Sequence, residues 1–223
     1  MEYVFRKKID IERHEHIYKG RHYNINYLEY AKKGSRHLLV TLSGFNGSEL
    51  EGRPAKYNYM RTLSDFPGNK LFIKDEVDDI PVYYYGEGGD TYYLDEVCRL
   101  IEDKCKEMGV QKEQLIIAGS SKGGTGALLI GFRLGAGHVI SGANQLDVGS
   151  YLYGLNEKLR NLLLMKMVGS IGEEEVHRLD QNIRKLILVE RTKSRLYFHA
   201  GNEDAHYYQH MQPMLKHFDQ HGI

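Results

Sequence analysis

One stretch, residues 114–129 (QLIIAGSSKGGTGALL), constrains the fold of this chain more than any other. It starts with the apolar run of residues 115–118, which is typical of a buried parallel strand. A glycine-rich turn follows, and then small and apolar residues that suit a helix packed closely against a sheet. The stretch therefore predicts a strand, a tight turn and a helix, with G-x-S-x-G in the turn and Ser121 at its centre.

The chemistry of serine explains why this layout points to a nucleophile. A serine hydroxyl reacts weakly, and it must stand clear of the sheet to meet both a base and a substrate. The turn that lifts it is crowded, so glycines stand two residues before and two residues after it, at Gly119 and Gly123. The backbone N–H of Lys122 would lie at the N-terminus of the next helix, where the helix dipole favours an oxyanion.

These residues allow two other interpretations. Residues 122–126 (KGGTG) resemble the start of a phosphate-binding loop, but such a loop needs Lys and Ser or Thr where this chain has Ala127 and Leu128. The plainer alternative is a glycine-rich turn with a structural serine, because G-x-S-x-G alone is a weak pattern. The apolar strand before it and the small-residue helix after it favour the nucleophile.

The other strands are expected from apolar patterns. Alternation of apolar and polar residues predicts exposed antiparallel strands at residues 3–9 and 23–30, and a turn near Lys19 and Gly20 joins them. Continuous apolar runs predict further strands at residues 37–42, 70–74, 136–142 and 195–200.

Helices are expected from apolar spacing and end signals. Residues 91–108 have helical spacing, with Asp90 as the expected N-cap and Gly109 as the expected end. Two further helical stretches, residues 149–168 and 172–188, have no strand between them. A last helix is expected to end at Gly222.

With the turns at residues 119–123, 43–45 and 201–204, the chain resembles the α/β-hydrolases over most of residues 23–223. The resemblance implies an α/β fold of three layers around a mostly parallel central sheet. A length of 223 residues fits a single domain over residues 1–223, and the resemblance implies a helical cap inserted in it at about residues 144–190.

The resemblance also implies the remaining site residues. A second oxyanion N–H would come from Gly44 or Phe45, in the turn after the third strand. An ordinary Gly/Asn turn is the alternative there. The acid of a catalytic triad would follow the seventh strand, with Asp204 as first choice and Glu203 as second. A solvated turn carboxylate is the alternative there.

The histidine of such a triad normally follows an eighth strand, and no strand is expected after the last helix. We therefore expect the last strand and its histidine to be absent from this chain. Among the histidines present, His206 is the candidate base. The less favoured candidates are His210, His217 and His221.

Within the superfamily, the sequence GSSKGGTGALLIGF is similar to bacterial capsule-biosynthesis proteins and to the hydrolase-like domain of accessory secretion-system proteins that help to O-acetylate glycans. This implies a serine esterase or an acyl- or acetyltransferase acting on a carbohydrate or other small-molecule ester, without a cofactor. The alternative is a catalytically inactive hydrolase fold that serves as a binding or scaffold subunit, with protein partners or as a homo-oligomer.

Composition excludes other classes. Basic and acidic residues balance at 30 each, so charge offers no case for binding nucleic acid or an anionic membrane. No apolar run approaches the length of a membrane span. Cys98 and Cys105 lie too far apart on one expected helix to bond, which favours a reducing, cytoplasmic setting. The eleven histidines show no metal-ligand spacing, so we expect no metal site.

Overall fold

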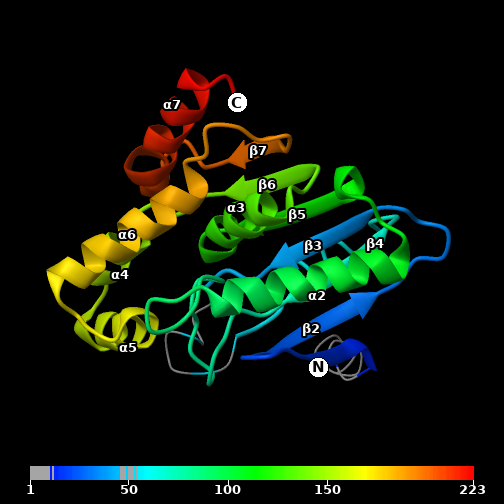
Figure 1. Ribbon diagram of the computed structural model, residues 1–223, viewed down its shortest axis with the longest axis horizontal. Helices are drawn as coiled ribbons and strands as arrows, with labels where there is room; N and C mark the ends of the chain where they lie inside the picture. The colour runs from blue at the N-terminus through cyan, green and yellow to red at the C-terminus, as the bar shows by residue number, and fades with distance from the viewer. Residues whose placement is uncertain (1–10, 12, 46–48, 50–52, 54) are drawn as a thin grey trace.

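A computed structural model describes residues 11, 13–45, 49, 53 and 55–223, and they form one seven-stranded sheet with helices packed against it (Figure 1). The sheet order is β1-β2-β4-β3-β5-β6-β7. The strands are β1 (Glu15–Lys19), β2 (Asn24–Tyr30), β3 (Leu38–Leu42), β4 (Asn69–Ile73), β5 (Leu115–Ser120), β6 (His138–Gly142) and β7 (Arg195–His199). The α-helices are α2 (Tyr92–Met108), α3 (Lys122–Leu134), α4 (Val148–Tyr153), α5 (Glu157–Val168), α6 (Glu173–Ile187) and α7 (Gln212–Gln220).

The sheet is mostly parallel, as expected from the continuous apolar runs. Strands β4, β3, β5, β6 and β7 run parallel to one another, whereas β2 is antiparallel to both β4 and β1. All five residues of β3 are buried, which explains why its sequence does not alternate. The prediction of an α/β fold with a mostly parallel sheet is confirmed.

The first hairpin differs from the prediction. The expected strand at residues 3–9 lies outside the described residues, and the strand that pairs with β2 is β1. The expected turn at Gly20 is present, and its N–H donates to the carbonyl of Tyr23 at 3.1 Å. β1 is nearly all exposed, so it carries no apolar pattern that a sequence reading would detect.

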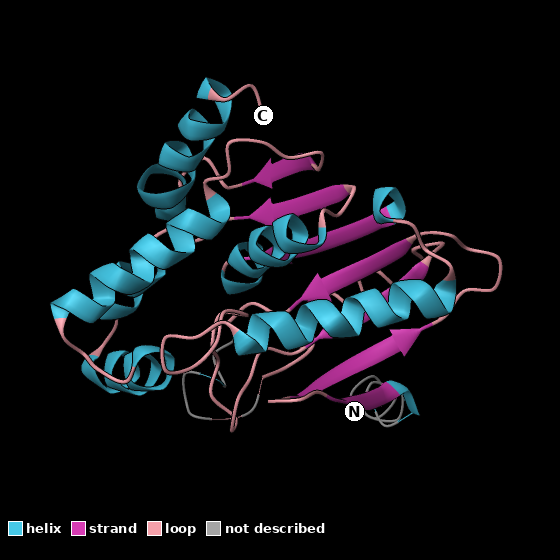
Figure 2. Cartoon of the chain, in the orientation of Figure 1, coloured by secondary structure: helices cyan, strands magenta, loops and turns pink. Residues whose placement is uncertain are grey.

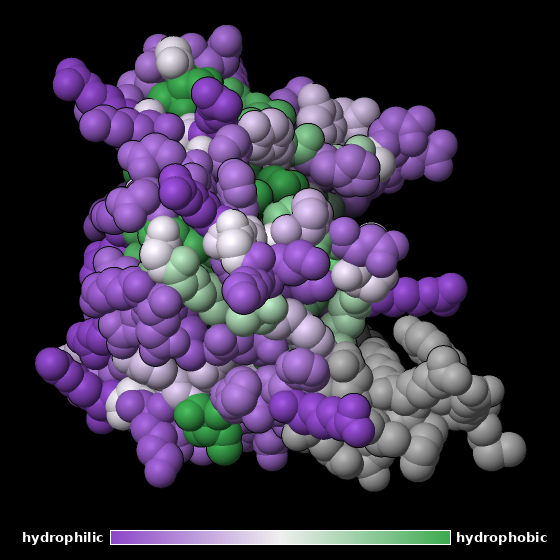
Figure 3. Space-filling model, turned by 90° about the vertical axis from the view of Figure 1, so that its right-hand side faces the viewer, coloured by the Kyte–Doolittle hydropathy of each residue, from purple (hydrophilic) through white to green (hydrophobic). Residues whose placement is uncertain are grey.

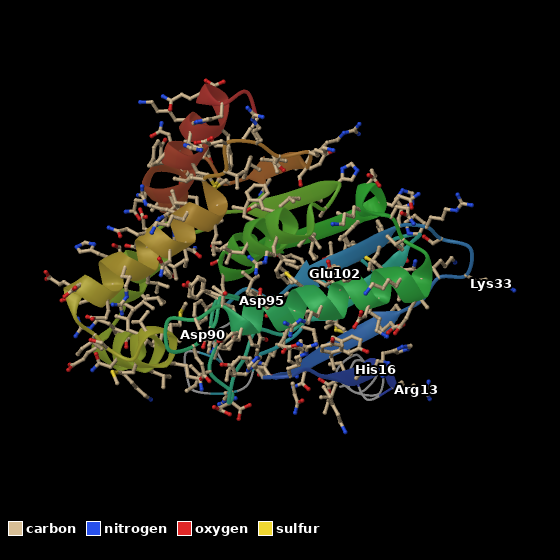
Figure 4. All side chains as sticks on the ribbon, in the orientation of Figure 1. Arg13, His16, Lys33, Asp90, Asp95 and Glu102 are labelled. Carbon is tan, nitrogen blue, oxygen red and sulfur yellow. The ribbon has the colours of Figure 1, made fainter. Side chains whose placement is uncertain are left out.

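The helix ends follow the capping rules, with small corrections. α2 begins one residue later than predicted, so its N-cap is Thr91 instead of the expected Asp90. Asp90, labelled in Figure 4, still accepts the N–H of Tyr92 at 3.0 Å. Gly109 ends α2 with a left-handed φ of 65°. The expected helix of residues 149–168 is two helices, because α4 ends at Gly154 and Asn156 caps the start of α5.

Helices α2 and α3 cover one face of the sheet (Figure 2) and bury the main core against β3, β5 and β6. Asp95 of α2 binds Arg133 of α3 at 2.7 Å. On the other face, Leu28, Tyr57 and Phe72 form a second, smaller cluster. Ile140 and Tyr197, paired across β6 and β7, remain 39% and 47% exposed.

Register brings the ends of five strands to one edge of the sheet. Residue pairs align the last residues of β4, β3, β5, β6 and β7, so the loops that follow them meet at this carboxyl edge. Helices α4, α5 and α6 lie beyond this edge (Figure 1). Seen from the opposite end, the surface is mainly hydrophilic (Figure 3). Within the described part of the chain, no helix is long and apolar enough to span a bilayer.

We predict that Gly126→Ala destabilises the protein. A Cβ at this position of α3 would lie 2.5 Å from the ring of Tyr84, which is fully buried and has no room to move. The expected loss in the free energy of unfolding is about 1–3 kcal/mol, measured by urea denaturation.

Gly154→Ala is the matched control. Gly154 has a right-handed φ of −76°, and the nearest atom to an added Cβ is 3.5 Å away. Its replacement should leave the free energy of unfolding unchanged within about 0.5 kcal/mol. Equal losses in the two variants would contradict the packing argument.

Candidate active site at the carboxyl edge

Ser121 occupies a sharp bend between β5 and α3. Its φ of 53° and ψ of −125° are strained for a residue with a side chain. A Cβ at Gly119 would lie 2.2 Å from the carbonyl oxygen of Gly123, and one at Gly123 would lie 2.6 Å from that of Leu42. The absence of side chains at these two glycines thus allows the main chain of the turn to approach itself and the end of β3 closely. Ser121 is partly exposed at the edge of the sheet.

The hydroxyl of Ser121 has a partner that sequence reasoning missed. Gln145, in the loop after β6, donates from Nε2 to Ser121 Oγ at 3.3 Å and to the carbonyl of Ala143 at 3.2 Å. Its main chain is clamped by Thr125, whose Oγ1 donates to the Gln145 carbonyl at 2.8 Å and accepts its N–H at 3.0 Å. The only sequence signal was a polar residue following a predicted strand.

The burial and ion pairs of the Lys122 side chain were also not predicted from the sequence. It is fully buried, and Nζ lies 3.1 Å from Glu49 Oε1 and 3.0 Å from Asp75 Oδ2, both of them also fully buried. Asp75 follows β4 and accepts the backbone N–H groups of Tyr83 and Tyr84 at 2.9 and 2.8 Å. A buried cluster of charges therefore lies at the start of α3, directly after Ser121.

The loop after β3 lies against the bend between β5 and α3. The N–H of Ser43 is used, because it donates to the Tyr84 hydroxyl at 2.6 Å, and that hydroxyl donates to the Ile73 carbonyl at 2.8 Å. A Cβ at Gly44 would lie 3.1 Å from the carbonyl oxygen of Ser120. The structure thus places Gly44 and Phe45 beside the turn that holds Ser121. Like every helix start, α3 leaves its first N–H groups, including that of Lys122, without helical partners.

The predicted acid and base lie after β7, at the same edge. Asp204 Oδ1 accepts the backbone N–H of His206 at 2.9 Å, so this carboxylate caps the start of the last helical segment. Glu203 is exposed. The Nδ1 atom of His206 is buried and has no hydrogen-bond partner. Among the described residues, no hydrogen bond joins Ser121 to a histidine or Asp204 to an imidazole.

The other histidines have structural contacts. His210 is 5% exposed, and its Nδ1 accepts the N–H of Asp147 at 3.4 Å. Burial lowers the pKa of His210 from its ordinary value, and the neighbouring Asp147 carboxylate opposes this shift. His217 lies against the Val189 carbonyl and His221 against that of His217.

Metal ligands do not gather in the described residues: no three His, Cys, Asp or Glu side chains there could hold an ion. Arg13 and His16, labelled in Figure 4, lie at the β1 edge of the sheet, and three strands separate β1 from β5, which leads to Ser121. Cys98 and Cys105 are both free, as expected. Burial raises the pKa of the Cys98 thiol to about 12, which keeps it protonated and unreactive.

Comparison with known proteins shows a likeness of fold. The chain matches no protein-family model, and no curated protein matches it in sequence. Among solved structures it is similar to the capsule O-acetyltransferase of Neisseria meningitidis serogroup A, with a TM-score of 0.74 and 19% identity over 93% of this chain and 82% of that one.

Two further structures show the same likeness. The Glycosylation Associate Protein (Gap123) complex from Streptococcus agalactiae has a TM-score of 0.72 and 18% identity, covering 92% of this chain and 39% of that one. FphF, a fluorophosphonate-binding serine hydrolase of Staphylococcus aureus, has a TM-score of 0.61 and 12% identity over 92% and 85% of the two chains. With its strand order, these matches show that the chain has an α/β-hydrolase fold.

We predict that His210 makes stability depend on pH. The unfolded chain binds a proton at this imidazole below about pH 6.5, whereas the buried imidazole binds it only at lower pH. Its contribution to the free energy of unfolding is therefore complete above that pH and is lost as the pH falls through the lowered pKa.

His210→Asn tests this prediction, because Asn keeps an acceptor near the position of Nδ1 but does not titrate. Urea denaturation at pH 8, 7, 6 and 5 should show a smaller loss of stability in the variant than in the wild type. Any packing defect would appear equally at pH 8. Identical slopes in the two proteins would contradict the assignment.

Proposed function

We propose that this chain is a serine-dependent acyl-transfer enzyme, an esterase or an acyl- or acetyltransferase, with Ser121 as its nucleophile. One observation carries the proposal: Ser121 is held in a strained conformation at the bend between a central parallel strand and a helix N-terminus. Residues with backbone strain of this kind cluster at functional sites. The start of the helix also offers N–H donors to a developing anion.

In the proposed reaction, Ser121 Oγ attacks the carbonyl carbon of an ester while a base takes its proton. The resulting oxyanion is bound by the N–H of Lys122 and by that of Phe45 or Gly44. The intermediate collapses to an acyl-enzyme as the protonated alcohol leaves. Water or a sugar hydroxyl then takes the acyl group. His206 is our candidate base and Asp204 the residue that orients it, with Glu203 as the alternative.

A polar substrate is favoured by groups that lack partners. The hydroxyl of Tyr83, the Oε1 atom of Gln145 and the Nδ1 atom of His206 are buried without a hydrogen bond, and each belongs to a segment that follows a strand of the parallel sheet. Unpartnered buried polar atoms are costly and often mark a missing ligand. A glycan or another polyhydroxyl compound supplies suitable hydroxyl groups, and the likeness to a capsule O-acetyltransferase supports the same class.

The helices beyond the carboxyl edge have a place in this proposal. We infer that α4, α5 and α6 form a cap within one domain. The end of α5 is fixed to the β4–α2 loop, because the Met167 carbonyl accepts the N–H of Gly89 at 2.7 Å and Lys166 pairs with Asp78 at 2.7 Å. The cap would then help to exclude water from Ser121.

A second candidate is a hydrolase fold without activity that binds a partner protein or a second copy in a polysaccharide or secretion pathway. The observation in its favour is that Ser121 Oγ is hydrogen-bonded to Gln145 and to no imidazole among the described residues. The similarity to a protein of the Gap123 complex supports a protein partner.

We predict that a fluorophosphonate probe labels the wild-type protein and does not label Ser121→Ala. The phosphonylated serine mimics the tetrahedral intermediate, so labelling requires both the nucleophile and the oxyanion donors. Ser120→Ala is the matched control and should keep its labelling, because the side chain of Ser120 is bonded to the Tyr59 hydroxyl instead. An unlabelled wild-type protein would favour the second candidate.

We predict that Asp204→Asn lowers kcat by about 10²–10⁴-fold, as expected for the acid of a triad. Asn can still accept the His206 N–H, so the helix cap and the melting temperature should change little. Glu203→Gln should keep wild-type turnover of p-nitrophenyl acetate. The reverse result would make Glu203 the acid, and full activity in both variants would remove this turn from the mechanism.

A further inference from the structure

The proposed chemistry uses only the backbone of Lys122, yet its side chain is fully buried together with the two carboxylates that it contacts. We propose that the Lys122 ammonium group is a positioning residue that holds the two oxyanion-donating segments in register. The inference rests on the proposed function, because it concerns the same two donors.

Stability does not explain a lysine at this position. Its side chain has no exposed surface, and a positive charge is unfavourable at a helix N-terminus. Ordering a long flexible side chain costs entropy, and removing an ammonium ion from water costs several kcal/mol. Buried ion pairs therefore often add no more stability than apolar residues of the same volume.

The contacts of Nζ instead join the segments that carry the donors. Lys122 itself belongs to the first turn of α3, while Glu49 and Asp75 belong to the chain after β3 and after β4. Nζ also lies 5.1 Å from the centre of the Phe45 ring, within the range of a cation–π contact. The side chain of Lys122, whose own N–H is one donor, therefore contacts the ring of Phe45, a candidate for the second donor. It also pairs with two carboxylates from the segments after β3 and β4.

The environment of Phe45 strengthens this arrangement. Its ring packs edge-on against Tyr83 at 5.6 Å, and Tyr83 donates its backbone N–H to Asp75, a carboxylate that pairs with Lys122. The Tyr84 ring lies 5.9 Å from Nζ, and its hydroxyl accepts the N–H of Ser43. Movement of the ammonium group would thus disturb the β3 loop from both sides.

Catalysis is sensitive to such movement. Oxyanion donors act at 2.7–3.1 Å from the developing charge, and loss of one donor costs about 10²–10³-fold in kcat. A group that fixes the distance between two donors would influence the transition state much more than substrate binding. The proposal therefore predicts an effect on kcat with little effect on KM.

The test compares Lys122→Met with the triple variant Lys122→Met, Glu49→Gln, Asp75→Asn. The single variant leaves two buried carboxylates without the ammonium group and should be less stable. The triple variant removes all three charges with residues of similar size and should recover much of that stability. Melting temperature, kcat and KM are measured with p-nitrophenyl acetate and with its thiono analogue.

The expected result is that kcat stays about 10²-fold below wild type in the triple variant, while its melting temperature recovers and KM stays within about twofold. The loss should be smaller with the thiono ester, since sulfur accepts hydrogen bonds weakly. A triple variant that is folded and fully active would overturn the inference, and so would an equal loss with both esters.

Glu49→Gln provides a test if both variants fail to fold. It keeps a hydrogen-bond acceptor for Nζ but removes one charge, and it should lower kcat about tenfold with KM unchanged. Wild-type kcat in this variant would overturn the inference. Fluorophosphonate labelling of the wild type separates the two failures, because an unlabelled wild type contradicts the proposed function itself.

Discussion

The candidate site depends on the close contact of backbone with backbone around Ser121. The start of α3 presses on the end of β3, where a Cβ at Gly123 would meet the Leu42 carbonyl oxygen at 2.6 Å. The N–H of Ser121 also donates to the Gly142 carbonyl at 2.8 Å, which ties the bend to β6. Because these contacts fix main-chain atoms, they place Ser121 without relying on flexible side chains.

The same close approach determines what surrounds the bend. In the first turn of α3, the Lys122 side chain is fully buried and contacts the segments that follow β3 and β4. Glu49 and Asp75 supply the opposite charges, and Asp75 is in turn held by backbone N–H groups of the β4–α2 loop. Burying these three charges at the start of α3 costs desolvation free energy. Exposed ion pairs at the surface, such as Lys106 with Asp103, lose little hydration.

Local patterns explain the parts of the structure that could be predicted. The apolar runs of β3 and β5, the spacing of α2 and the G-x-S-x-G turn depend on neighbouring residues, so they are visible in the sequence. The resemblance added the α/β-hydrolase fold, and similar solved structures bear it out. Roles of the individual site residues remain proposals.

What could not be predicted depends on contacts distant in the chain. Lys122 meets Glu49 across a separation of 73 residues, and Gln145 meets Ser121 across 24. A sequence reading expects an exposed lysine and a loop glutamine at such positions. Strand β1 was not predicted for another reason: its residues are mostly exposed, and it owes its extended conformation to pairing with β2. The Asp204 turn was located correctly by its pattern, but the pattern did not show that the carboxylate caps a helix.

The contact between Ser121 and Gln145 agrees with the role proposed for Ser121, although it engages the serine hydroxyl. Gln145 donates from Nε2, because the nearby Ala143 carbonyl also requires a donor, so the serine oxygen is the acceptor. The hydroxyl proton of Ser121 therefore remains available to a base on another side. A donor aimed at the serine oxygen also stabilises negative charge on it as that proton leaves. In the proposed reaction the glutamine would therefore favour loss of the hydroxyl proton to the candidate base His206, and it would not compete with that base for the proton.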